Sequence, residues 1–98
     1  MASRVYLIGI RWVKTPMNVD KLDQLLGLHG DWVRYNGYTW LYWTQLSADH
    51  VYNMIGPHLT TEDSTLVVRV DPSEYQGWAP PFIWTWLADK KKRIERGE

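Results

Sequence analysis

The sequence of 98 residues contains no cysteine. Disulfide frameworks, thiolate metal ligands and cysteine nucleophiles are therefore excluded together. Phenylalanine occurs once, whereas tryptophan occurs seven times and tyrosine six times. Tryptophan and tyrosine combine a large apolar ring with a hydrogen-bonding group, which suits them to interfaces and ligand surfaces as well as to cores.

Long apolar runs are also lacking. The stretch Val5–Val13 is interrupted by Arg11 and is too short to span a membrane. No signal peptide is recognisable, so we expect a cytoplasmic protein with no membrane partner. A length of 98 residues predicts one domain that can bury a core without help from metals or disulfides.

The formal net charge is zero, but the two signs are unevenly distributed along the chain. Residues 1–89 are mildly acidic, whereas residues 90–98 contain the basic run Lys90-Lys91-Lys92-Arg93. A short basic run is weaker support for nucleic-acid binding than a broad basic face, and it favours a solvated end of the chain. We therefore predict a single domain over residues 1–89 and a basic C-terminal tail over residues 90–98.

Hydrophobic periodicity and turn residues predict an α+β fold with the ferredoxin-like order β-α-β-β-α-β. Asn18 and Ser47 are suited to cap the two helices, and Pro57 is expected to end the second. A C-terminal element over residues 82–93 is either an additional helix or a fifth strand, and Pro81 favours the helix. The expected strands are Arg4–Val13, Asp31–Tyr35, Tyr38–Gln45 and Thr65–Val70, and the expected helices begin at Asn18 and Ser47.

The pair Asn36-Gly37 is typical of a two-residue type I′ hairpin turn. Such a turn would pair Tyr35 with Tyr38 and would put Arg34 and Trp32 on the sheet face away from the helices. We expect the more apolar face of each strand to lie under the helices, which leaves Arg11, Arg34 and Arg69 together on the other face. Their expected neighbours there are Leu7, Trp32, Leu41, Trp43 and Val67.

This Arg/Trp face has three possible roles. The first is a dimer interface, where tryptophan and arginine are favoured. The second is a ligand surface, on which nucleobases stack while arginine contacts phosphate. The third is a surface covered by the chain's own C-terminal segment, which contains three tryptophans. If it is a ligand site, the residues that bind are Arg11, Arg34, Arg69, Trp32 and Trp43.

Motifs that would indicate catalysis are absent from the sequence. The three histidines form no i, i+4 pair suited to a metal, and no serine stands in a nucleophile-elbow sequence. No glycine-rich phosphate loop is present. We expect no catalytic residues, no metal site and no cofactor.

Several short aromatic motifs resemble a known family. Thr39-Trp40-Leu41, Thr44-Gln45-Leu46-Ser47-Ala48 and Pro57-His58-Leu59 resemble segments of small proteins labelled SinR-family, as does Gly77-Trp78 followed by Trp86-Leu87. Those proteins resemble the CRISPR-associated spacer-acquisition nuclease-like family (the second Cas protein). The similarity covers roughly residues 4–88. It implies a ferredoxin-like homodimer of bacterial or phage origin, linked to defence or mobile elements.

Nuclease-like members of that family have a metal-binding aspartate at the end of the first strand. Arg11 stands at the corresponding place here, and a cation cannot coordinate Mg²⁺. We therefore expect a non-enzymatic homodimeric binding module that captures a nucleotide or nucleic acid in a bacterial or phage defence or counter-defence setting. The alternatives are a divergent metal-dependent nuclease and a protein-binding inhibitor or antitoxin.

Overall fold

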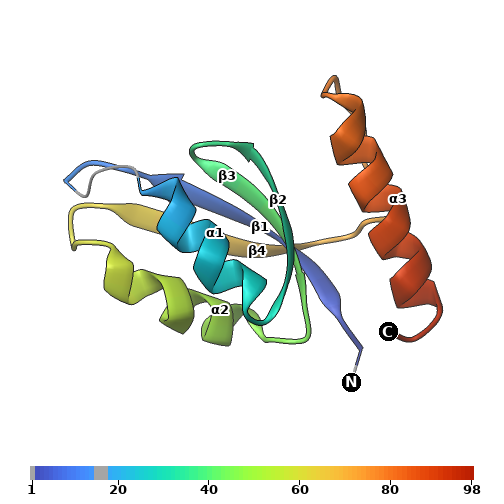
Figure 1. Ribbon diagram of the computed structural model, residues 1–98, viewed down its shortest axis with the longest axis horizontal. Helices are drawn as coiled ribbons and strands as arrows, with labels where there is room; N and C mark the ends of the chain where they lie inside the picture. Colours follow the sequence, from blue (N-terminus) through green and yellow to red (C-terminus); the bar gives the residue numbers. More distant parts are fainter. Residues whose placement is uncertain (1, 15–17) are drawn as a thin grey trace.

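Four strands form one antiparallel sheet in the computed structural model, which describes residues 2–14 and 18–98. The strand order is β2-β3-β1-β4, so β1 is central, as its apolar sequence predicts. Together with the helices, the sheet makes an α+β fold, which confirms the α+β part of the prediction (Figure 1). The strands are β1 (Arg4–Arg11), β2 (Gly30–Asn36), β3 (Thr39–Thr44) and β4 (Ser64–Val70).

Two helices connect the strands, and both begin where their capping residues predict. The side chain of Asn18 accepts a hydrogen bond from Lys21 N–H ahead of α1 (Val19–Gly27). The hydroxyl of Ser47 accepts one from His50 N–H ahead of α2 (Ala48–Ile55). Each cap satisfies a backbone N–H that the first helical turn leaves without a partner. A short 3₁₀ helix, η1 (Gly56–His58), follows α2 and contains the expected stop at Pro57.

The main core lies between these helices and one side of the sheet. Figure 1 shows α1 and α2 next to each other on that side. Tyr42 is fully buried there and donates a hydrogen bond to the Leu26 carbonyl oxygen at 2.7 Å. Burial raises the pKa of the Tyr42 hydroxyl. The buried core residues are Tyr6, Ile8, Ile10, Leu22, Leu26, Trp40, Tyr42, Val51 and Ile55.

The third helix, α3 (Pro81–Glu95), confirms the helical alternative for the C-terminal segment, with Pro81 in its first turn. It stands apart from α1 and α2, across β2 (Figure 1). Ile83, Leu87 and Lys90 are its buried residues. Lys90 contacts Asp31 and Trp43, which lie on the side of the sheet that α1 and α2 leave free. Thus α3 covers one end of this helix-free side.

The predicted division of the chain at residue 89/90 falls inside α3, because the helix continues to Glu95. The basic run is therefore helical, and its first residue, Lys90, is only 4% exposed. The end of the chain also returns to the sheet, since Ser3 N–H donates to the Glu98 carbonyl oxygen at 2.9 Å. No helix of residues 2–14 and 18–98 is long and apolar enough to cross a membrane.

The predicted hairpin register is wrong by one residue. Asn36 pairs with Thr39, and a bulge at Tyr35 makes Arg34 pair with Trp40. The turn is Gly37-Tyr38, and Gly37 does not have the positive φ of a type I′ turn. Instead, the Asn36 side chain accepts a hydrogen bond from Tyr38 N–H at 2.8 Å, and this Asx turn needs no positive φ.

The face assignment of β4 is also wrong. Ile8 of the core pairs with Val67, so Thr65, Val67 and Arg69 lie on the helix-covered side. The more apolar set of Leu66, Val68 and Val70 lies on the other side, where Leu66 is 69% exposed. The prediction assumed that the more apolar face of every strand lies under the helices. In β4, an edge strand, the more apolar face lies on the helix-free side instead, so apolarity did not identify the helix-covered face.

Candidate binding surface

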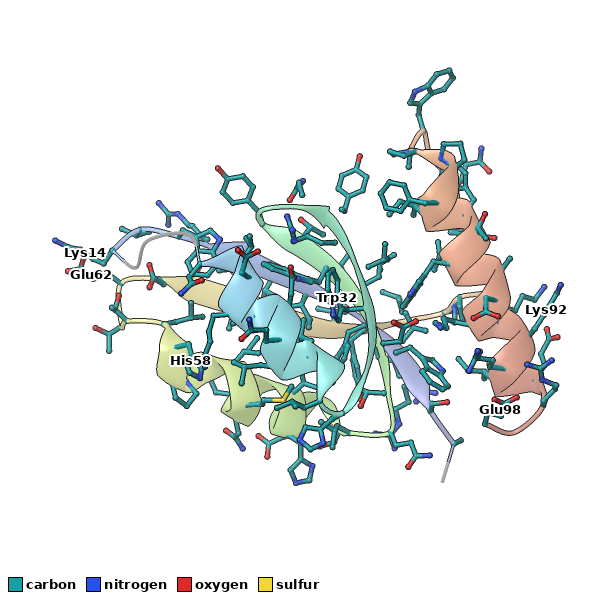
Figure 2. All side chains as sticks on the ribbon, in the orientation of Figure 1. Lys14, Trp32, His58, Glu62, Lys92 and Glu98 are labelled. Carbon is teal, nitrogen blue, oxygen red and sulfur yellow. The ribbon has the colours of Figure 1, made fainter. Side chains whose placement is uncertain are left out.

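The five predicted ligand-binding residues do not form one face. Trp32 pairs with Tyr42 and Arg34 pairs with Trp40, and both of these partners belong to the main core. Trp32 and Arg34 are therefore on the helix-covered side. Figure 2 shows Trp32 beside α1, and its Nε1 lies 3.7 Å from the position a side chain at Gly27 would occupy. The one-residue bulge in β2 is the physical reason, because a slip by one residue reverses every side chain.

Arg34 has a structural partner in α1. Its Nε lies 3.3 Å from Asp23 Oδ2, and the other oxygen of Asp23 accepts a hydrogen bond from Trp40 Nε1 at 2.7 Å. Asp23 is only 12% exposed at its side chain. This carboxylate therefore joins α1 to β2 and β3, and Arg34 contributes to the packing of the domain.

Arg69, Arg11 and Trp43 occupy three separate places. Arg69 pairs with Tyr6 and is exposed on the helix-covered side at the C-terminal end of β4. Arg11 is exposed at the end of β1 opposite Ser64, and Trp43 lies at the other end of the sheet beneath α3. Of the five residues, only Arg11 and Trp43 share the helix-free side.

A charged and aromatic contact, which the sequence analysis missed, holds α3 to the sheet. Lys90 Nζ lies 2.6 Å from Asp31 Oδ2 and 3.1 Å from Asp89 Oδ2. The same ammonium group lies 5.1 Å from the ring centre of Trp43 and 5.3 Å from that of Trp86, within the range of cation–π attraction. One sequence signal was available, since Trp86 and Lys90 are four residues apart on a helix.

An apolar row crosses the rest of the helix-free side. Leu7 pairs with Leu41 on one flank and with Val68 on the other, and Leu41 pairs with Val33. Directly paired residues on one face of a sheet are neighbours. Val33, Leu41, Leu7 and Val68 therefore form a continuous line across all four strands, which we call the apolar row.

The apolar row is open to solvent at its β4 end. Val68 is 49% exposed, and Leu66 in the next row of the same face is 69% exposed. Gly9, which pairs with Leu66, has nothing within 4 Å of the position a side chain would occupy. This part of the surface is therefore apolar, and residues 2–14 and 18–98 leave it exposed.

Residues 2–14 and 18–98 contain no group of three or more His, Asp or Glu side chains placed to hold a metal ion.

Comparison with known proteins adds no relative. No family model, no curated protein and no solved structure matches this chain significantly.

Proposed function

We propose that the chain is a homodimeric binding module whose two copies associate through the apolar row on the helix-free side of the sheet. The observation that supports this proposal is the exposure of Leu66 and Val68 beside a line of apolar side chains that crosses every strand. Contiguous exposed apolar surface of this kind is typical of protein–protein contact sites.

A second copy of the chain is the partner that fits this surface. A two-fold axis would place the apolar row of one copy against that of the other, which makes a self-complementary interface. Of the strand residues that α3 leaves uncovered on this side, only Arg11 is charged. The chain has a formal net charge of zero, so two copies do not repel each other as whole molecules.

The proposal includes the ferredoxin-like type of fold. The order β1-α1-β2-β3-α2-β4 and an antiparallel sheet with both connecting helices on one side support that assignment. The opposite side of the sheet is apolar here, so its exposure to water is unfavourable and it gains from being covered. Here α3 covers one end of it, and the proposed partner covers the remainder.

The oligomeric state in solution tests the proposal. Sedimentation analysis at about 100 µM should give a dimer, because a contact with a micromolar dissociation constant is saturated at that concentration. Val68→Glu should give a folded monomer, since a carboxylate buried in an apolar contact would be desolvated without a partner.

The matched control is Leu28→Glu. Leu28 is 71% exposed, about as much as Leu66, but it follows α1 on the opposite side of the molecule. This variant should remain a dimer. A monomeric wild type at 100 µM, or equal dissociation in both variants, would contradict the proposed interface.

A further inference from the structure

Trp78 lies in the loop between β4 and α3 and is 97% exposed, the highest fraction among the large apolar side chains of residues 2–14 and 18–98. The loop around it is closed by a stack of the Tyr75 and Trp84 rings, whose centres lie 5.5 Å apart and whose planes differ by 11°. Because the closed loop already orders the backbone, burying this indole on another surface would cost less conformational entropy than for a free chain end.

Two further aromatic side chains near the start of α3 are exposed, Phe82 by 52% and Tyr75 by 42%. We call Tyr75, Trp78 and Phe82 the aromatic group. Residues 75–88 contain no charged side chain. Nucleic acids are held largely by cationic side chains, so an apolar protein surface is the better match for the aromatic group.

The helix-free side of the sheet has one covered and one open end. At the covered end Val5 is only 1% exposed and pairs with Trp43 beneath α3. Gly9 lies about 13 Å further along β1, four residues at roughly 3.3 Å each. No atom of residues 2–14 and 18–98 lies within 4 Å of the position a side chain at Gly9 would occupy, and its paired neighbour Leu66 is exposed. The open end therefore contains an apolar notch at Gly9.

The area that a stable dimer needs points to a further contact beside the apolar row. A specific interface buries about 800 Å² per partner. An aromatic side chain supplies about 150–250 Å², and leucine and valine are smaller, so Leu66 and Val68 together supply less than about 500 Å². The aromatic group is a reserve of apolar area on the element that covers this same side.

Symmetry brings the two ends together. A two-fold axis parallel to the apolar row and passing near Leu7 places the row of one copy on the row of the other. The same axis sets the covered end of each copy against the open end of its partner. Since α3 is fixed at the covered end through Lys90, the aromatic group at its start faces the partner's open end.

We propose that Trp78 of each copy packs into the notch at Gly9 of the second copy, beside Leu66. This inference rests on the proposed homodimer and names what covers the open end of its sheet. An aromatic ring packed over a strand glycine replaces the contacts that the missing side chain cannot make. Arg11, the next residue of β1 on this side, is placed to stack on the indole. By symmetry the dimer contains two such contacts.

Sedimentation equilibrium of Trp78→Ser tests the contact. The dissociation constant of the dimer should rise at least about thirtyfold, the change that defines an interface hot spot. Circular dichroism should be unchanged, because Trp78 is almost fully exposed within one copy. The matched control is Tyr52→Ser, which removes a half-exposed ring from α2 on the opposite side and should leave the dissociation constant as it is.

The outcomes separate this contact from the dimer itself. If Val68→Glu is monomeric but Trp78→Ser associates as the wild type does, the apolar row is the interface and the Trp78 contact is wrong. If the wild type is monomeric at about 100 µM, a concentration that saturates micromolar association, both proposals are wrong.

Gly9→Phe tests the notch from the other side. Gly9 does not have a positive φ and has free space at its side-chain position, so the strand should accept the substitution. The new ring would occupy the place of the partner's Trp78, and dimerisation should weaken about as much as in Trp78→Ser. Unchanged or tighter association would contradict the notch.

A mixture of the two variants gives the sharpest test. A heterodimer of Trp78→Ser with Gly9→Phe retains one intact contact, from the remaining Trp78 to the remaining Gly9, and its other notch is filled without obstruction. Each homodimer has no intact contact. Native mass spectrometry of an equimolar mixture should therefore show heterodimer well above the half of all dimers expected by chance. A proportion of about one half, the chance value for independent association, would overturn the pairing of Trp78 with Gly9.

Discussion

Asp23 is the residue through which α1 contacts two strands at once. Its two oxygens accept a hydrogen bond from Trp40 Nε1 and face Arg34 Nε. Trp40 is fully buried, so its N–H has no access to water if the carboxylate is removed. The residue therefore contributes to stability through the groups that would remain unpaired without it.

We expect Asp23→Ala to lower the free energy of unfolding by about 1–3 kcal/mol, the usual range for a buried donor left without its acceptor. Urea denaturation followed by tryptophan fluorescence measures the change. Asp20→Ala is the control, because Asp20 is exposed in the first turn of α1 and should cost about 0.3–1 kcal/mol through the helix dipole. Equal losses in the two variants would show that the contact of Asp23 with Trp40 and Arg34 contributes nothing measurable.

Arg34 shows where the sequence-based prediction of the site fails. Successive side chains of a strand point to opposite faces of the sheet, so the face on which Arg34 lies can be predicted only if the register of the hairpin is known. A single extra residue at Tyr35 moves Arg34 and Trp32 to the helix-covered side. The sequence gives no sign of this bulge, because Asn36-Gly37 is equally compatible with the regular turn.

At the scale of the elements, α3 is held to the sheet by the contacts around Lys90. The buried ammonium group pairs with Asp31 and Asp89, and two tryptophan rings lie within 5.3 Å of it. Its aliphatic stem can pack against the rings while the charge is satisfied by carboxylates from two elements. This explains why a basic run that resembles a solvated tail is part of a docked helix.

Asp89 makes the stability contributed by α3 dependent on pH. The hydrogen bond from Lys90, together with the charges of Lys90 and Arg93, lowers the pKa of Asp89 below its ordinary value of 3.8. A group whose pKa is lowered by folding stabilises the fold above the pKa of the unfolded chain, and this contribution is lost as pH falls through the folded pKa. The loss therefore occurs below about pH 4.

Urea unfolding of the wild type and Asp89→Asn at several pH values measures this contribution. We expect the wild type to be the more stable protein at neutral pH and the difference to shrink as pH falls below about 4. In a Lys90→Met background the difference should be small at every pH, because Lys90 is the first cause of the lowered pKa. A difference that does not change with pH would contradict this account.

The elements themselves were largely predictable. Asn18 and Ser47 cap the two connecting helices as expected, and β1 is central as its two apolar faces indicate. Helix caps and hydrophobic periodicity are local signals that a sequence carries directly. The partner of each strand face is not local, and it was the pairing of β2 and β4 that the prediction assigned wrongly.

At the scale of the whole molecule, the two sides of the sheet are apolar for different reasons. One side packs against α1 and α2, and the other packs against α3 at one end and presents the apolar row elsewhere. An apolar set such as Leu66, Val68 and Val70 is compatible with either side. Sequence reasoning that assumes one buried face therefore cannot place β4, although it does predict that both faces of β1 need cover.

If two copies cover the apolar row, the stability of the fold must depend on protein concentration, because association favours the folded chain by mass action. A tenfold rise in concentration is worth about 1.4 kcal/mol per dimer, which should raise the unfolding midpoint by roughly 3 °C or more. Differential scanning calorimetry of the wild type over a hundredfold range of concentration measures this shift. The Val68→Glu variant should unfold at a midpoint that does not change with concentration, and Leu28→Glu should behave as the wild type does. A wild-type midpoint that is also constant would mean that the apolar row remains uncovered in the native protein.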